Sequence, residues 1–175
     1  MLLHSFSLSL SLSLSFRLSR SFNHLVLILV ANFIISGIKG IVCPLGWFRF
    51  QNKCYGFHSV PQSWKDAETD CQQYSQHAHL ASIVSKMEQE MIASHISTNY
   101  ITSKGVWIGL YDSCMKKCWK WTDYSSIPYV SWDETFPRPR NYLNCIQLSA
   151  SSGFKKWKNR NCSKKAQFLC MLRRY

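Results

Sequence analysis

The stretch Val106-Trp107-Ile108-Gly109-Leu110 decides the fold of this chain. Its unbroken run of apolar side chains, several of them β-branched or aromatic, predicts a short buried strand. Later runs rich in aromatic or apolar residues predict further short strands, at residues 119–122, 145–148, 154–157 and 168–171. We therefore expect the C-terminal part of the chain to form small antiparallel β-sheets.

Two amphipathic helices are predicted before this strand. In the first, apolar side chains recur at steps of three and four residues over 64–74, directly after Ser63, which is a favourable N-cap. In the second, Ser85 and Glu88 form a capping box before an apolar stripe that continues to residue 96. A short strand is expected between them at 79–83. Two helices followed by short antiparallel strands indicate an α+β domain.

The cysteines indicate a disulfide-stapled protein. Their number is even and all lie at or beyond residue 43, which favours four bridges formed in an oxidising compartment. A structural zinc site is disfavoured because the only close pair is separated by three residues and has no second pair beside it. The eight cysteines are Cys43, Cys54, Cys71, Cys114, Cys118, Cys145, Cys162 and Cys170.

Residues 1–40 are interpreted as a low-complexity leader with a signal peptide, and residues 41–175 as one domain. The apolar run at 25–38 follows Arg17 and Arg20, which is the pattern of a secretory signal, so we expect a secreted, extracellular protein. The alternative is a type II membrane receptor that is anchored by the same run. A run of 14 residues is shorter than the roughly 20 that span a bilayer, which favours cleavage.

The charge of the chain is strongly positive. The formal net charge is +12, and residues 41–175 retain 18 basic and 9 acidic side chains. From residue 151 to the end there are eight basic residues and no acidic one, so the positive charge is locally concentrated. Polyanions are attracted to such a surface. An extracellular location favours sulfated glycans, anionic lipids or microbial envelopes over nucleic acid, and the alternative is a cationic surface that serves solubility alone.

The order of these motifs resembles the C-type lectin-like domain family. Its helical Trp-x-x-Ala-x-x-x-Cys pattern is found at 64–71, its Trp-Ile-Gly-Leu strand at 107–110 and its Trp-x-Trp at 119–121. The match extends from Cys43 to Leu172. Within the family, Cys-x-x-Gly-Trp-Phe at Cys43 and the segment 78–83 resemble the secreted regenerating-islet (Reg) branch, while snake-venom and eggshell lectins are close alternatives.

This resemblance implies a C-type lectin-like fold with a set disulfide pairing. The implied bridges join Cys43 to Cys54, Cys71 to Cys170 and Cys145 to Cys162. Cys114 and Cys118 then remain, and we expect them to pair with each other. The alternative is an intermolecular bridge that would make a dimer, and the oligomeric state is left open.

Calcium binding is not expected at the family's usual position. The resemblance implies three sources of calcium ligands in the sugar-binding members. They are a Glu-Pro-Asn or Gln-Pro-Asp loop, an acidic residue before a later strand, and an Asn-Asp pair after a tryptophan. Here the loop at 134–141 has arginines beside its prolines, Leu143 stands two residues before Cys145, and Lys158-Asn159 follows Trp157. Calcium needs six to eight oxygen ligands, so we predict no metal and no cofactor at this loop. Scattered carboxylates elsewhere, such as Asp112 and Asp123, are the alternative.

The same replacement predicts an anion-binding surface. If the loop folds beside the last strands, its basic and amide side chains converge where relatives hold sugar. Guanidinium groups pair bidentately with sulfate, phosphate and carboxylate. The expected partners are glycans or sulfated polysaccharides such as heparin, on cells or microbes. The candidate carbohydrate- and anion-binding residues are Arg138, Arg140, Asn141, Lys156, Lys158 and Asn159.

Catalysis has little support in the sequence. No Gly-x-Ser-x-Gly, phosphate-binding loop or His-Glu-x-x-His occurs, so we expect a binding protein and no catalytic residue. Phe136 and Tyr142 are candidates to stack on a sugar ring or to cover the loop. Three alternatives have other ligands: a signalling ligand or venom-type lectin that docks a protein, a membrane receptor, and a membrane-active antimicrobial lectin that contacts the lipid surface.

Overall fold

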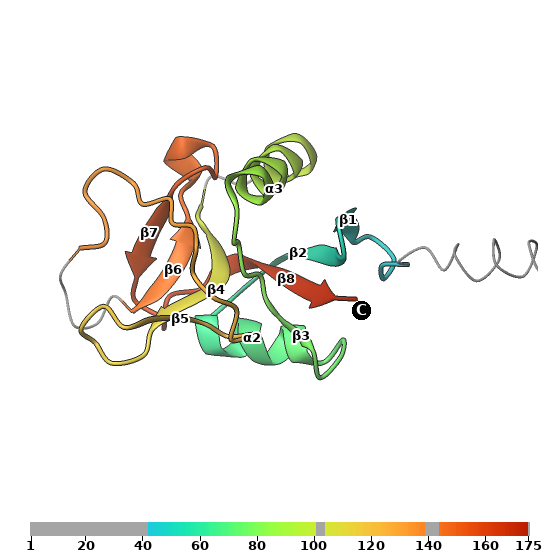
Figure 1. Cartoon of the computed structure of the whole chain (residues 1–175), viewed down its shortest axis with the longest axis horizontal. Helices are drawn as coiled ribbons and strands as arrows, with labels where there is room; N and C mark the ends of the chain where they lie inside the picture. The colour runs from blue at the N-terminus through green and yellow to red at the C-terminus, as the bar shows by residue number, and fades with distance from the viewer. Residues whose placement is uncertain (1–41, 101–103, 139–143, 175) are drawn as a thin grey trace, which may run out of the picture. The chain divides into compact units, whose positions relative to one another are not determined.

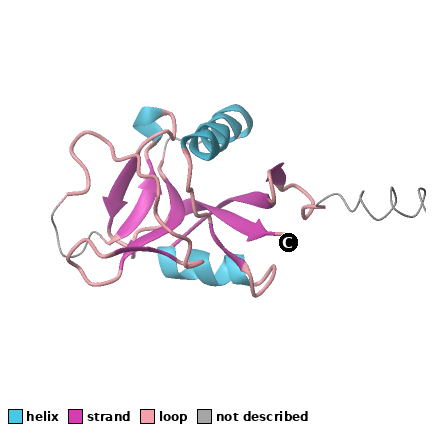
Figure 2. Cartoon of the chain, in the orientation of Figure 1, coloured by secondary structure: helices cyan, strands magenta, loops and turns pink. Residues whose placement is uncertain are grey.

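The computed structural model describes residues 42–100, 104–138 and 144–174, and residues 43–175 belong to one compact unit (Figure 1). The expected leader and signal peptide, and the candidates Arg140 and Asn141, lie outside the described residues. The elements, shown by type in Figure 2, are β1 (Phe48–Phe50), β2 (Lys53–Gln62), α2 (Trp64–Gln72), β3 (Ala78–Leu80), α3 (Lys86–Asn99), β4 (Val106–Asp112), β5 (Trp119–Trp121), β6 (Cys145–Leu148), the 3-10 helix η1 (Ala150–Ser152), β7 (Trp157–Arg160) and β8 (Ala166–Arg173).

Both predicted helices form and begin at the predicted caps. The Ser63 side chain accepts the backbone N–H of Asp66, and the Ser85 side chain accepts that of Glu88. The predicted capping box is only half made, because the Glu88 carboxylate accepts the Val84 N–H and turns into the protein interior. Helix α2 also ends two residues before Tyr74, whose side chain is about half exposed.

The strands form one sheet in the order β1-β2-β8-β4-β6-β7, with β3 added to β8 and β5 added to β4. Most pairs are antiparallel as expected, but β4 and β8 run parallel, so the sheet is mixed. The expected strand at 154–157 is wrong in position. Gly153 and Phe154 both have positive φ, which turns the chain after η1, and the strand begins only at Trp157. The strand expected at 79–83 is reduced to β3.

Hydrophobic side chains are buried on both faces of the sheet. Figure 1 shows α2 and α3 on opposite sides of β2 and β8. One cluster packs Ile92 and Ile96 of α3 against Ile108 and Trp157, while the other packs Ala67 of α2 against residues of β4 and β8. The predicted buried strand is confirmed, because the residues at 106–110 are all buried.

Four disulfides hold this unit together: three are the pairs that the resemblance implied, and the fourth is the expected pairing of the two remaining cysteines. They join Cys43 to Cys54, Cys71 to Cys170, Cys114 to Cys118 and Cys145 to Cys162. The second of them links α2 to β8 across 99 residues of sequence. Because Cys114 and Cys118 pair within the chain, they do not supply the intermolecular bridge that was the alternative.

Candidate functional site

Strand β7 divides the predicted site between the two faces of the sheet. Side chains alternate along a strand, so Trp157 and Asn159 share one face and Lys158 and Arg160 share the other. Trp157 is fully buried in the core and Asn159 is 2% exposed. Lys158 is partly exposed and Arg160 is exposed. The candidates Lys158 and Asn159 therefore face in opposite directions.

On the core face, Asn159 holds the loop that contains Pro137. Its side-chain oxygen accepts the backbone N–H of Arg138 at 2.8 Å, and its side-chain nitrogen donates to the Arg138 carbonyl oxygen, also at 2.8 Å. The Phe136–Pro137 peptide bond in this loop is cis. The Arg138 guanidinium lies 4.6 Å from the centre of the Phe136 ring, so this ring, a candidate to stack on sugar, is partly covered by a cation.

On the other face, basic side chains from three segments surround one open hollow of about 380 Å³. Lys158 pairs across the strands with Gln147 of β6, and Arg160 pairs with Cys145. Lys104 enters from the segment before β4, while Lys164 and Lys165 come from the segment before β8. We call this the basic hollow, and it is lined by Lys104, Gly105, Gln147, Lys158, Arg160, Lys164, Lys165 and Ala166.

The local environment of Lys158 reflects this crowding of cations. Burial lowers the pKa of the Lys158 ammonium, and the neighbouring Arg160 guanidinium lowers it further, while Asp133 acts in the opposite direction. Among the described residues, no acidic side chain lines the basic hollow. The positive potential there is therefore not cancelled by a carboxylate in its wall.

The structure thus brings only some of the predicted site residues together. Arg138 and Asn159 are in direct contact, Lys158 lies on the opposite face, and Lys156 is exposed in the turn between η1 and β7, where its backbone N–H donates to Ser152. We expected all these side chains to converge beside the loop, and this expectation is wrong for Lys158. The alternation of side chains along β7 points Lys158 away from the loop. The placement of Arg140 and Asn141 is outside the described residues.

Four basic residues of the basic hollow were not among the predicted site residues. Arg160, Lys164 and Lys165 belong to the basic C-terminal run, and the spacing of Arg160 from Trp157 could have placed it on the face of Lys158. Lys104 carries no such signal in the sequence. It reaches the hollow because β4 pairs with β6, with Val106 opposite Leu148.

The scattered carboxylates that could have formed another calcium site are engaged in local contacts. The Asp112 carboxylate accepts the backbone N–H groups of Lys117 and Cys118 at 2.8 and 2.9 Å. The Asp123 carboxylate accepts the hydroxyls of Ser82 and Ser125 and lies 3.5 Å from an Arg173 nitrogen. Each carboxylate therefore serves as a hydrogen-bond acceptor within its own part of the fold.

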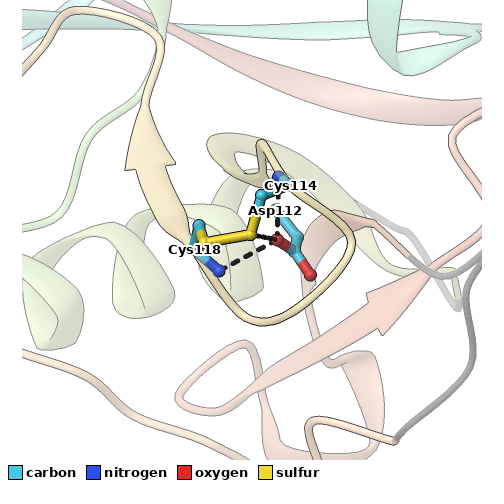
Figure 3. A group of neighbouring side chains, drawn as sticks. All are labelled: Asp112, Cys114 and Cys118. Carbon is cyan, nitrogen blue, oxygen red and sulfur yellow. Dashed lines mark hydrogen bonds between the residues drawn. A yellow bond between two sulfur atoms is a disulfide. The ribbon is translucent and has the colours of Figure 1, made fainter.

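Asp112, Cys114 and Cys118 also lie close enough together to suggest a metal centre, with ligand atoms within 4.8 Å of one another (Figure 3). The two sulfur atoms are bonded to each other, as the yellow bond in Figure 3 shows. Thiolate is the form of cysteine that binds metals, and a disulfide does not provide it. We interpret residues 112–118 as a loop that is closed by the disulfide and whose backbone N–H groups donate to the Asp112 carboxylate.

None of the helices within the described residues is long and apolar enough to cross a membrane. The apolar run at 25–38, which was considered as an anchor, lies outside those residues.

Comparisons with known proteins agree with this architecture. The lectin C-type domain family matches residues 60–172. Regenerating islet-derived protein 4 of Homo sapiens is 35% identical over 153 residues, which cover 85% of this chain and 95% of that protein. C-type lectin BiL of Bothrops insularis is 37% identical over 146 residues, covering 82% of this chain and 91% of that protein.

A solved structure is similar over the same region. Human lithostathine superposes with a TM-score of 0.73 and 32% identity, covering 77% of this chain and 93% of that one. The predicted fold class and the predicted resemblance to the Reg branch are both confirmed by these similarities.

Proposed function

Because this chain belongs to the C-type lectin domain family, with relatives in its Reg branch, we propose that it is a secreted, non-catalytic lectin that binds anionic glycans without calcium. Its ligands in this proposal are acidic or sulfated carbohydrates on cell surfaces, in matrix or on microbes. The eight paired cysteines support an oxidising, extracellular compartment.

The observation that carries the proposal is the double hydrogen bond between Asn159 and the backbone of Arg138. The family resemblance places one calcium ligand after Trp157 and others in the Pro137 loop. Here the Asn159 amide uses both its oxygen and its nitrogen to fasten that loop. An exposed guanidinium on Arg138 stands beside it, and a fixed cation repels a divalent cation. Calcium requires several converging oxygens, and among the described residues no group of three His, Cys, Asp or Glu ligand atoms gathers at this loop, which supports the proposal.

The preference for anionic ligands follows from the positive charge of β7 and of the C-terminal segment. Lys156, Lys158 and Arg160 lie on or beside β7, and the 151–175 segment contains no acidic residue. Extended arrays of cations attract polyanions at long range, and salt weakens that attraction by screening. Carbohydrates that carry sulfate or carboxylate groups provide the complementary charge.

A glycan array tests the proposal. The oxidatively folded protein is applied to neutral, sialylated and sulfated glycans, with calcium or with EDTA, at several salt concentrations. We expect binding to the acidic glycans to survive EDTA and to weaken steeply towards 1 M salt, where the screening length is about 3 Å. Binding that disappears in EDTA would refute calcium independence. A blank array, with cell binding that persists after glycan removal, would favour a protein ligand.

A further inference from the structure

The basic hollow has the composition of an anion-binding site. Its five charged side chains among the described residues are all basic, and they come from β7, from the segment before β4 and from the segment before β8. Within the described residues, Lys158, Arg160, Lys164 and Lys165 form no ion pair with a carboxylate. Clustered cations repel one another, and a bound polyanion would remove that repulsion. The arrangement therefore gains most from a ligand with several negative charges.

The uncharged residues of the lining indicate which class of polyanion fits the basic hollow. It consists of Gly105, Gln147 and Ala166, and none of these is aromatic or large and apolar. Proteins that insert into anionic membranes use exposed Trp, Phe or Leu next to their cations, and proteins that bind single-stranded nucleic acid stack bases on aromatic rings. Both features are missing from the part of this lining that the described residues form. A hydrophilic chain that carries sulfate groups requires neither of them.

A second hollow among the described residues has the opposite character. It has a volume of about 580 Å³ and is lined by rings such as Trp47, Tyr74 and Tyr100 together with Asp70, and its lining within the described residues contains no lysine or arginine. A carboxylate among aromatic rings repels an anionic chain. Of these two hollows, only the basic hollow is complementary to a polyanion.

We infer that the basic hollow is the binding site for a sulfated polysaccharide, on the face of β6 and β7 opposite the Pro137 loop. This inference rests on the proposed function. It places the ligand-binding site away from the Pro137 loop, which is where the family resemblance would place it. Arg160 offers a planar guanidinium that pairs bidentately with a sulfate group, while the lysines act as point charges around it. Gln147, which is directly opposite Lys158, adds an amide for sugar hydroxyls.

Heparin is a suitable probe, and three full-length variants locate its site. The basic-hollow variant is Lys104→Gln/Lys164→Gln/Lys165→Gln, and all three side chains are exposed. The matched control, Lys65→Gln/Lys116→Gln/Lys120→Gln, removes the same charge from exposed positions elsewhere. The loop variant, Arg138→Gln/Lys156→Gln, removes the two described basic residues of the predicted site that lie outside the basic hollow. Heparin affinity is measured by calorimetry over a salt series, and near-ultraviolet circular dichroism verifies folding.

We expect the basic-hollow variant to lose heparin affinity by about tenfold or more, since three screened charge contacts are removed together. Its salt dependence should also become shallower, by on the order of one unit of slope per lost lysine. The matched control and the loop variant should change affinity by less than about threefold. A Lys104→Arg/Lys164→Arg/Lys165→Arg variant keeps the charge and should retain binding.

The outcomes separate this inference from the proposed function. Equal losses in the basic-hollow variant and the matched control, or a larger loss in the loop variant, would overturn the location while leaving calcium-independent binding in place. If the wild-type protein binds neither heparin nor the acidic glycans of the array, the proposed function itself fails. Displacement of heparin by duplex DNA or by phosphatidylserine vesicles at equal charge concentration would overturn the assignment to sulfated polysaccharide.

Discussion

The ammonium group of Lys53 lies 2.7 Å from the Glu88 carboxylate, and only 8% and 3% of the two side chains are exposed. The same carboxylate accepts the Tyr55 hydroxyl and the Val84 N–H. Burial, and then the charge of Glu88, raise the pKa of the Tyr55 hydroxyl well above its usual range, so it remains a donor at all physiological pH values. This buried ionic cluster connects β2 to the start of α3.

Removing one charge of this pair should be strongly destabilising. Glu88→Gln leaves the Lys53 ammonium buried beside a neutral amide, and such a loss costs about 3 to 5 kcal/mol. The control is Glu90→Gln, because Glu90 is the exposed partner of Lys86 at 3.8 Å and should contribute less than about 0.5 kcal/mol. Urea unfolding measures both. Equal effects of the two variants would show that burial does not govern this pair.

Gln89 is a second polar side chain of α3 that reaches into the core, where it is 1% exposed. It accepts the Trp157 ring N–H and donates to the Phe154 carbonyl oxygen at 2.6 Å. Gln89→Leu should cost about 1 to 3 kcal/mol for each buried group left without a partner. Gln73→Leu, at an exposed position, is the control and should be nearly neutral. Thermal unfolding with near-ultraviolet circular dichroism distinguishes the two, and a neutral Gln89→Leu would contradict the assignment.

The pair formed by His79 and Glu68 should make stability depend on pH. A hydrogen bond to Glu68, at 2.6 Å, raises the pKa of His79, although burial opposes the shift. The folded protein therefore holds this proton more tightly than the unfolded chain does. The resulting stabilisation is fully present below the unfolded value of about 6.5 and is lost as pH rises through the higher folded-state pKa.

The measurement for this pair is the urea midpoint of wild type and His79→Gln from pH 5 to 8. The difference between them should be largest at low pH and shrink as pH rises. Comparing variants is necessary because burial lowers the pKa of His58 and of His95, which makes stability change in the opposite sense. His77→Gln, at an exposed position, provides the matched control. A difference in urea midpoint that grows as pH rises would contradict a raised pKa of His79.

The disulfides should differ in their contribution to stability. Loop-closure entropy assigns about 2 kcal/mol to a loop of roughly five residues and about 4 to 5 kcal/mol to one of roughly 100 residues. Cys114→Ser/Cys118→Ser should therefore leave a folded protein, in which Asp112 still accepts the loop N–H groups. Cys71→Ser/Cys170→Ser should be far less stable. Calorimetric unfolding compares the two, and a larger loss for the 114–118 variant would contradict this order.

Much of the fold could be predicted because its signals are local. Ser63 and Ser85 begin the two helices as expected, since an N-cap acts within three residues of itself. The apolar run at 106–110 is the buried strand that its composition predicted. The prediction of a strand at 154–157 failed because Gly153 and Phe154 have positive φ values, which delay the start of the strand to Trp157. Of these two residues, only the glycine is a sequence signal for such a turn.

The sequence by itself determined the two capped helices, the buried central strand and the excess of positive charge. The tertiary structure alone decided where that charge is gathered. Lys104 and Lys158 line the same hollow because β4 pairs with β6 and β6 with β7. Asn159 turns inward because Trp157 fills the core two residues earlier. Strand register and the choice of the buried face depend on pairing between segments that are distant along the chain, so local sequence does not contain them.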